Sequence, residues 1–301
     1  MNTLLVAGFG AAAVRIATPL LLAALGETIA ERGGVLDLGI EGAMLIGALA
    51  SVFGAVAGGP WVGIVVGSAA GALTAAVFAA VALGAGADQV VTGTAITLGA
   101  TGLTGAIYRM TYGSASGALQ LPTLPNVHIP LLGSIPILGP ALFDQPWVTY
   151  GCYLAVPLVW WLLFRTRWGL ELRASGESPT AAAASGVRVL RLRITATVIG
   201  GAFAGLAGAG LVLTQIGTFA ENMTAGRGFI AIAIVVLGRW SPFRVAIAAL
   251  AFGALTALQF LLQGLGLHVP YQLFLVLPYA VALLALGGAV GRTRAPESLG
   301  R

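Results

Sequence analysis

The sequence predicts an all-α integral membrane protein, a polytopic bundle of about 8–10 transmembrane helices. Of its 301 residues, 58% are hydrophobic and only 8% are charged, whereas soluble domains carry roughly 25% charged residues. Apolar runs long enough to cross a bilayer recur along the whole chain, and arginines cluster between them. We therefore expect residues 1–301 to form a single transmembrane domain in contact with lipid. The net charge of +5 then comes from arginines that lie between the apolar runs and set the membrane topology, so we expect no nucleic-acid partner.

Nine apolar runs account for most of the chain. They lie at about 8–30, 35–57, 61–85, 89–112, 147–165, 194–217, 227–239, 243–264 and 270–290. The run at 227–239 is too short to span a bilayer by itself, because a spanning helix needs about 20 residues. It must either include residues 218–226 or form a half-helix that is buried in protein.

Small residues recur at four-residue spacing within two of these runs. They are Gly63, Gly67 and Gly71 in one run and Gly201, Gly205 and Ala209 in another. Small residues at this spacing allow the backbones of membrane helices to approach closely, so they predict packing seams. Between two runs, Gly84 and Gly86 predict a tight turn, after which Asp88 can cap the next helix.

The arginines indicate which side of the membrane each loop faces. If the nine runs alternate across the bilayer, twelve arginines share one side with the loop at 166–193, and Arg15, Arg109 and Arg227 lie on the other. Since arginine favours the cytoplasmic side, 166–193 is predicted to be a cytoplasmic loop and 113–146 an external segment. The N-terminus then lies outside, and we expect no cleaved signal peptide. The predicted location is the bacterial cytoplasmic (inner) membrane.

The external segment 113–146 has an unusual composition. Prolines interrupt it too often for a helix, yet it is too apolar for a free loop. We expect a folded cap that lies on the outer mouth of the bundle or dips into the membrane. This cap either receives an external partner or packs against the ends of the helices.

The cytoplasmic loop contains the pattern of a short helix. Ser178 can cap its N-terminus, Pro179 fits the first helical position, residues 180–185 are rich in alanine, and Gly186 suits a left-handed stop. An isolated helix of two turns is not stable in water, so another surface must hold it. We expect it to dock into a groove on another protein; the alternative is an ordinary loop that contains Ala and Gly.

Residues 172–187, LRASGESPTAAAASGV, resemble the cytoplasmic coupling segment of ABC importer permeases with the vitamin B12 permease type of fold (type II importers). The residues that carry the match, with the proline that starts the helix, are Ala174, Gly176, Glu177, Pro179, Ala182 and Gly186. The resemblance implies that they contact an ATP-binding cassette subunit. The chain has no GxxxxGK[ST] loop, so ATP and Mg²⁺ are expected on that partner, and this chain is expected to be non-catalytic.

Acidic residues cluster at the first boundary between apolar runs. Glu27 and Glu31 precede this boundary, and Asp37 and Glu41 follow it. Asp37 and Glu41 are four residues apart, which on a helix places them on one face. A carboxylate inside the membrane is costly, so Glu41 either lines a polar path or accepts hydrogen bonds that fix a helix break. Arg32 is the only obvious candidate for an ion pair with it.

Residues 26–48, GETIAERGGVLDLGIEGAMLIGA, resemble the signature of nucleoside permeases in the superfamily of branched-chain amino acid, ribose and nucleoside ABC permeases. Residues 38–42 and Met44 match this signature, whereas Asp37 stands where Asn is usual. Residues 135–143 and 226–242 extend the resemblance. The resemblance implies that this chain is the permease subunit of an ATP-driven importer. The implied partners are an external substrate-binding protein and a second permease chain, more often a related chain than an identical one.

Several polar and aromatic residues are candidates for the substrate path. They are Asp37, Glu41, Gln215, Asn222 and Phe229. Amide groups with an aromatic partner suit neutral nucleosides. A glutamine in a membrane helix is also a common hydrogen-bonding link between helices.

Two other functions stay open. An ion-coupled secondary transporter would carry protons or sodium on Asp37 and Glu41, and an ABC permease for simple sugars would share the same architecture. A membrane enzyme has little support, because Cys152, His128 and His268 form no metal-binding or nucleophilic constellation. We expect no catalytic residue, metal site or cofactor in this chain.

Overall fold

The computed structural model describes residues 2–113, 119–130, 133, 135–136, 138–264, 276, 280 and 295–300. Within these residues the protein is predominantly helical, as predicted. Seven of the described helices are long and apolar enough to cross a membrane. The predicted span at 270–290 lies outside the described residues, apart from residues 276 and 280.

The helices long enough to span, in chain order, are α1 (Asn2–Arg32), α2 (Ile40–Gly58), α3 (Pro60–Ala79) continued by the π-turn η1 (Ala80–Gly84), α4 (Gln89–Tyr112), α6 (Trp147–Arg165), α9 (Val189–Gly210) continued by the π-turn η2 (Leu211–Ile216), and α11 (Pro242–Gly264). The shorter helices are α5 (Leu138–Leu142), α7 (Arg167–Glu177), α8 (Pro179–Ala184) and α10 (Arg227–Leu237). Two short strands, β1 (Asn126–His128) and β2 (Asp144–Pro146), pair in antiparallel fashion.

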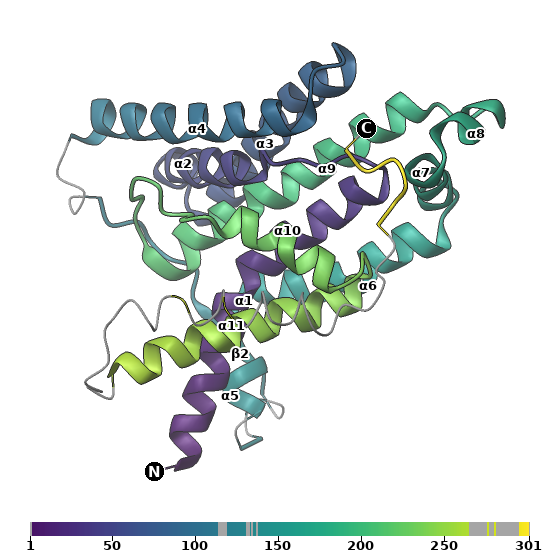
Figure 1. Cartoon of the computed structure of the whole chain (residues 1–301). Coiled ribbons are helices and arrows are strands. Elements are labelled where there is room, and N and C mark those ends of the chain that lie inside the picture. Colours follow the sequence, from purple (N-terminus) through teal and green to yellow (C-terminus); the bar gives the residue numbers. More distant parts are fainter. Residues whose placement is uncertain are drawn as a thin grey trace.

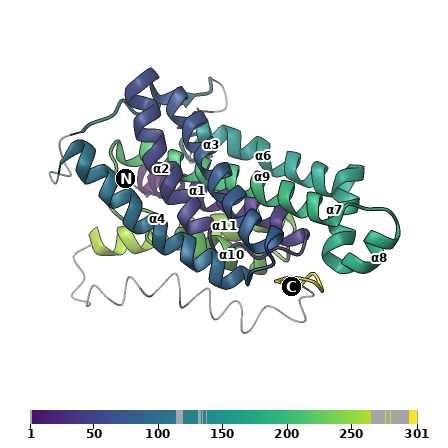
Figure 2. The ribbon, with the colours of Figure 1, turned by 90° about the horizontal axis from the view of Figure 1, so that it is seen from above.

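The spanning helices form one bundle with α1 and α9 at its centre. Helix α1 crosses the bundle and packs against both α9 and α11, while α2, α3 and α9 pack against one another. Helices α7 and α8 project at one end of the bundle, and residues 295–300 lie at the same end (Figures 1 and 2). We call this the α8 end.

The predicted glycine seams are where these helices meet. A Cβ atom added to Gly67 of α3 would lie 2.7 Å from the carbonyl oxygen of Gly47 on α2 and 2.8 Å from the Cβ of Ala209 on α9. A Cβ on Gly71 would lie 2.5 Å from the Cα of Gly205 on α9. Both distances are too short for a side chain, so these glycines allow backbone-to-backbone packing, and the prediction of packing seams is confirmed.

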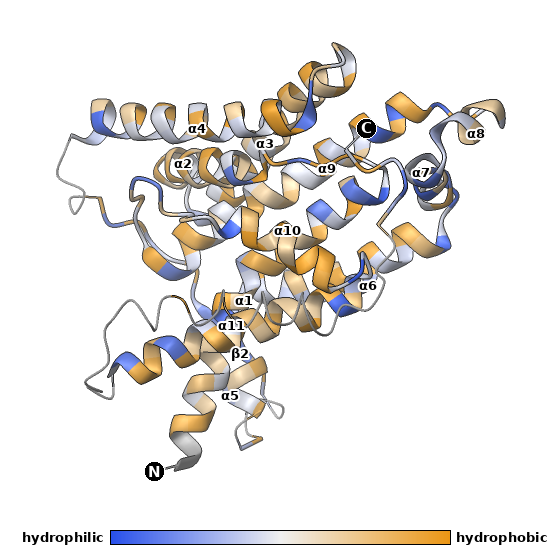
Figure 3. Ribbon diagram, in the orientation of Figure 1, coloured by the Kyte–Doolittle hydropathy of each residue, from blue (hydrophilic) through white to orange (hydrophobic). Residues whose placement is uncertain are grey.

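Apolar side chains cover the outside of the bundle. Leu98 of α4 is 74% exposed and Ile247 of α11 is 70% exposed, which is expected for side chains that contact lipid. Hydrophilic residues gather instead on α7 at the α8 end (Figure 3). The two distributions agree with an all-α polytopic membrane protein.

Helix α10 is a half-helix. Its 11 residues extend about 16 Å, roughly half of the apolar thickness of a bilayer. The residues before it do not continue the helix, because Asn222 and Ala225 have the left-handed φ values +54° and +47° and Gly226 has +81°. Of the two alternatives for the seventh apolar run, the structure has the half-helix.

Where the structure describes it, the segment between α4 and α6 is folded and packs on the bundle. Helix α5 lies against α1, and the side-chain amide of Gln145 donates to the carbonyl oxygen of Ala141 at 2.9 Å. The N–H of Leu121 donates to the carbonyl oxygen of Gly217 at 2.8 Å. These contacts agree with the expected folded cap and with packing against the ends of the helices.

Candidate coupling surface and buried carboxylates

Helix α8 has the ends that the sequence predicts. The hydroxyl oxygen of Ser178 accepts a hydrogen bond from the N–H of Ala181 at 3.4 Å, and Pro179 occupies the first helical position. Gly186 follows the helix with φ +85°, a conformation that favours glycine over other residues. The two turns between these residues are held against α7 and α9.

Helix α7 is an element that the sequence analysis missed. Thr166 caps it by accepting from the N–H of Gly169 at 3.0 Å. Its buried residues are Gly169, Leu172, Ser175 and Gly176. Their spacing of three or four residues is the signal of an amphipathic helix and could have revealed it.

The predicted coupling residues divide between two faces. Ala174, Glu177 and Gly186 are exposed. Gly176 and Ala182 are buried, and Gly176 packs against the carbonyl oxygen of Arg32 at the end of α1. Gly176 therefore allows α7 to pack closely against α1 and is not accessible to another protein. We use the name α8 surface for the exposed residues of α8 and of the last turn of α7, which are Ala174, Glu177, Thr180, Ala181, Ala183 and Ala184.

Glu41 binds the N-terminus of α10. Its side chain is buried, with 4% exposed, and its two carboxylate oxygens accept from the N–H of Gly226 at 2.8 Å and the N–H of Gly228 at 2.5 Å. A carboxylate is stabilised at this position by the unpaired N–H groups and by the helix dipole. Arg32 is not its partner, and that expectation is wrong. Arg32 instead donates to the carbonyl oxygen of Trp240 at 3.0 Å.

Asp37 lies before α2, so the prediction that Asp37 and Glu41 share a helical face is wrong. One carboxylate oxygen of Asp37 accepts from the N–H of Gly39 at 2.8 Å, and the N–H of Asp37 donates to Glu27 at 3.1 Å. Burial raises the pKa of Asp37 to about 7, and the Gly39 N–H lowers it by a smaller amount. Glu27 and Glu31 are also buried, and Glu31 accepts from the indole N–H of Trp240.

The other predicted path residues occupy one continuous stretch, η2 through α10. Gln215 donates to the carbonyl oxygen of Arg15 at 2.9 Å, so its amide links η2 to α1. Asn222 is exposed in the turns before α10, and Phe229 of α10 is 41% exposed. Glu41 meets this stretch through backbone groups, whereas Asp37 does not contact it through any hydrogen bond found among the described residues.

Within the residues that the structure describes, no group of three or more His, Cys, Asp or Glu side chains is placed to hold a metal ion. Cys152 is buried and forms no disulfide bond. The chemistry that the buried carboxylates perform here is hydrogen bonding to backbone N–H groups and to Trp240.

Comparisons with known proteins identify the class. Residues 11–286 match the family described as the permease component of the branched-chain amino acid transport system. A Haloferax volcanii ABC transporter permease protein, provisionally named for glucose, is 44% identical over 266 residues, 87% of this chain and 79% of that protein. No solved structure was found to match.

Two further relatives match almost from end to end. A guanosine ABC transporter permease protein of Bacillus subtilis is 39% identical over 296 residues, 94% of this chain and 92% of that protein. A nucleoside ABC transporter permease protein of Lactococcus lactis is 31% identical over 299 residues, again 94% and 92%. Proteins of this class are non-catalytic and multi-pass in the bacterial inner membrane, and they work with an ATP-binding subunit that hydrolyses ATP and with a substrate-binding protein. The chain therefore belongs to the branched-chain amino acid transport permease family, as a membrane-spanning subunit of an ABC transporter.

Proposed function

We propose that this chain is the permease subunit of an ATP-driven nucleoside importer. The observation that carries this proposal is the similarity to a guanosine permease over 94% of this chain and 92% of that protein. The similarity to a second permease named for nucleosides covers the same shares. The segment that contains Asp37 and Glu41 also has the signature typical of nucleoside permeases, except for Asp37 itself.

The geometry around Glu41 is compatible with a neutral substrate. Both oxygens of the Glu41 carboxylate accept backbone N–H groups at the start of α10. The charge is therefore neutralised locally and does not stand free for a cationic substrate. Nucleosides are neutral and rich in hydrogen-bonding groups, which such a protein can bind through amides, hydroxyls and backbone.

A simple sugar is the second candidate substrate. The relative that is 44% identical to this chain is provisionally named for glucose. Sugars are neutral as well, so the charge argument does not separate them from nucleosides. A direct measurement of uptake is needed.

Reconstitution into proteoliposomes tests the substrate. The chain would be assembled with its ATP-binding subunit, its second permease chain and its binding protein, and uptake of labelled guanosine would be measured with ATP supplied to the ATPase side. We expect ATP-dependent guanosine uptake that excess unlabelled guanosine suppresses and excess glucose leaves unchanged. ATP-dependent glucose uptake that guanosine does not suppress would assign the chain to sugar transport instead.

The α8 surface is the proposed contact with the ATP-binding subunit. It is exposed and projects at the end where the arginine distribution predicts cytoplasm (Figure 1). Its small alanine side chains suit insertion into a groove, and residues Ala174 to Gly186 resemble the coupling segment of type II importers. Movement of the ATP-binding subunits would act on this surface and alternate the access of the path. The partner permease chain is proposed to be related to this chain but not identical.

A further inference from the structure

Arg193 of α9 connects three separate segments at the α8 end. Its side chain is buried, with 9% exposed. Its Nε donates to the carbonyl oxygen of Gly33, in the turn after α1, at 2.9 Å. Its Nη2 donates to the hydroxyl oxygen of Ser298 at 2.8 Å and, with longer geometry, to the carbonyl oxygen of Ser175 on α7 at 3.4 Å.

Ser298 completes the connection between these segments. Its backbone N–H and its hydroxyl donate to the carbonyl oxygen of Gly176 at 3.0 Å and 2.7 Å. Two residues later, the N–H of Gly300 donates to the carbonyl oxygen of Gly34 at 3.1 Å. Residues 298–300 therefore bridge α7 and the turn between α1 and α2. We call Arg193, Ser298 and the backbone groups that they bind the α7–α1 junction.

The junction lies directly behind the α8 surface. Ala174 and Glu177 are exposed on α7, while Ser175 and Gly176, between them in sequence, face the junction. The N–H of Ser178 at the start of α8 donates to the carbonyl oxygen of Ala174 at 2.9 Å. A displacement applied to the exposed face is thus delivered to the junction through a single helix.

From the junction, the chain segment 33–41 leads to α10. The chain from Gly34 to Gly39 is not helical and begins and ends in turns, and the N–H of Leu36 donates to the side chain of Gln89 at 2.8 Å. Seven residues after Gly34, Glu41 binds the N-terminus of α10. Residues 33–41 therefore connect the junction to the only described half-helix among the apolar runs.

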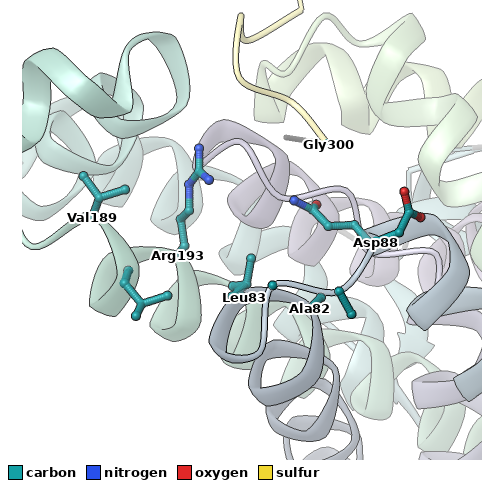
Figure 4. Close-up of a pocket in the computed structure, with 10 residues that line it drawn as sticks. Ala82, Leu83, Asp88, Val189, Arg193 and Gly300 are labelled. Atoms are coloured by element: carbon teal, nitrogen blue, oxygen red, sulfur yellow. The ribbon is translucent and has the colours of Figure 1, made fainter.

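A cavity lies between the junction and the turn that joins α3 to α4. Its volume is about 660 Å³. Figure 4 shows Ala82, Leu83 and Asp88 on one side and Val189 and Arg193 of α9 on the other, with Gly300 nearby. The cavity therefore separates Arg193 from the turn between α3 and α4, whereas Val35 next to the junction packs against Phe78 and Ala82.

We propose that Arg193 is a positioning residue for coupling. With Ser298 it joins α7 to residues 33–41, so that a displacement of the α8 surface by the ATP-binding subunit is transmitted to Glu41 and α10. The inference rests on the proposed contact between the α8 surface and the ATP-binding subunit. Two features support a role beyond fold stability. The junction binds segments that are 105 and 160 residues away from Arg193, and the chain segment 33–41 leads from it to Glu41, which binds the half-helix.

Hydrogen–deuterium exchange of the assembled transporter in lipid nanodiscs tests this transmission. Exchange would be compared with and without bound ATP, using an ATP-binding subunit that cannot hydrolyse it. In the unmodified chain, ATP should change exchange in residues 167–187 and in residues 33–42. In Arg193→Lys, which loses the planar fork, and in Ser298→Ala, the change at 167–187 should persist while the change at 33–42 falls about threefold or more.

Thr195→Val is the matched control on α9, because the hydroxyl of Thr195 donates only to Leu192 of its own helix in the described contacts. It should respond like the unmodified chain. If 33–42 responds equally in the control, in Arg193→Lys and in Ser298→Ala, the junction does not transmit the movement and the inference is wrong. If 167–187 does not respond even in the unmodified chain, the proposed coupling surface fails, and the junction fails with it as a coupling device. If one of the two variants does not assemble, the other decides the test, since Arg193→Lys and Ser298→Ala remove different hydrogen-bonding groups of the junction.

Discussion

Asp37 is a buried carboxyl group whose protonation is tied to folding. Burial raises its pKa from 3.8 to about 7, so between these two pH values the folded chain holds a proton that the unfolded chain has lost. The free energy of unfolding then decreases as pH rises through this window and is constant above it, as far as this group is concerned. The stabilising form of Asp37 is the neutral one.

Replacing Asp37 with Asn removes this dependence. The amide oxygen of Asn can still accept from the N–H of Gly39, and Asn carries no charge to bury. We expect Asp37→Asn to raise the thermal unfolding temperature in detergent at pH 8 and to change it much less at pH 5. An equal difference at both pH values, or a loss of stability at pH 8, would contradict this explanation.

Local sequence chemistry predicted the two ends of α8 correctly, whereas it placed Asp37 wrongly on a helical face with Glu41. Ser178, Pro179 and Gly186 act on their own helix, and each has the predicted position. Glu41 was identified as a costly carboxylate, but its partners Gly226 and Gly228 are 185 and 187 residues away. Nothing in the sequence near Glu41 specifies these partners. From sequence, Arg193 was only one of the twelve arginines assigned to the cytoplasmic side, because its partners Gly33 and Ser298 are also distant in the chain.

At the scale of elements, the apolar runs located the helices, and long-range hydrogen bonds decided where some of them begin. The run that was expected to start at residue 35 yields a helix only from Ile40. Residues 36 and 37 instead donate their N–H groups to the side chains of Gln89 and Glu27. A polar side chain that satisfies backbone N–H groups competes with helix formation, and periodicity does not show it.

The α8 surface leads to a prediction about binding of the ATP-binding subunit. Ala183 is exposed on α8 and lies between Ala182 and Ala184 in the sequence, so Ala183→Arg should add a long charged side chain without disturbing the bundle. We expect Ala183→Arg to reduce co-purification of the ATP-binding subunit by about tenfold, equivalent to about 1.4 kcal/mol. The amount of membrane-inserted chain should not change.

Ala85→Arg is the control for Ala183→Arg. Ala85 is also exposed and lies in the turn between α3 and α4, outside α7 and α8. It should leave co-purification unchanged, because an added charge by itself does not release the partner. Full retention of the ATP-binding subunit by Ala183→Arg would show that α8 does not lie in the interface.

At the scale of the whole molecule, the buried carboxylates bear on whether transport is driven by an ion gradient or by ATP hydrolysis. An ion-coupled transporter needs carboxylates that exchange ions with water on each side of the membrane. Asp37 and Glu41 are both only 4% exposed, and both are engaged by backbone N–H groups. Such groups stabilise the fold at a helix break and a helix N-terminus, and they are poorly placed to load an ion from solution in this conformation.

We therefore expect ATP hydrolysis to be the only energy source for transport. In proteoliposomes that contain the assembled transporter, ionophores that dissipate proton and sodium gradients should leave uptake of labelled guanosine unchanged. An ATP-binding subunit that cannot hydrolyse ATP should abolish it, because the permease family obtains its energy from that partner. Uptake that an imposed proton or sodium gradient drives without ATP, and that Asp37→Asn abolishes, would instead identify an ion-coupled carrier. The two carboxyl groups would then have to leave the hydrogen bonds described here during each cycle.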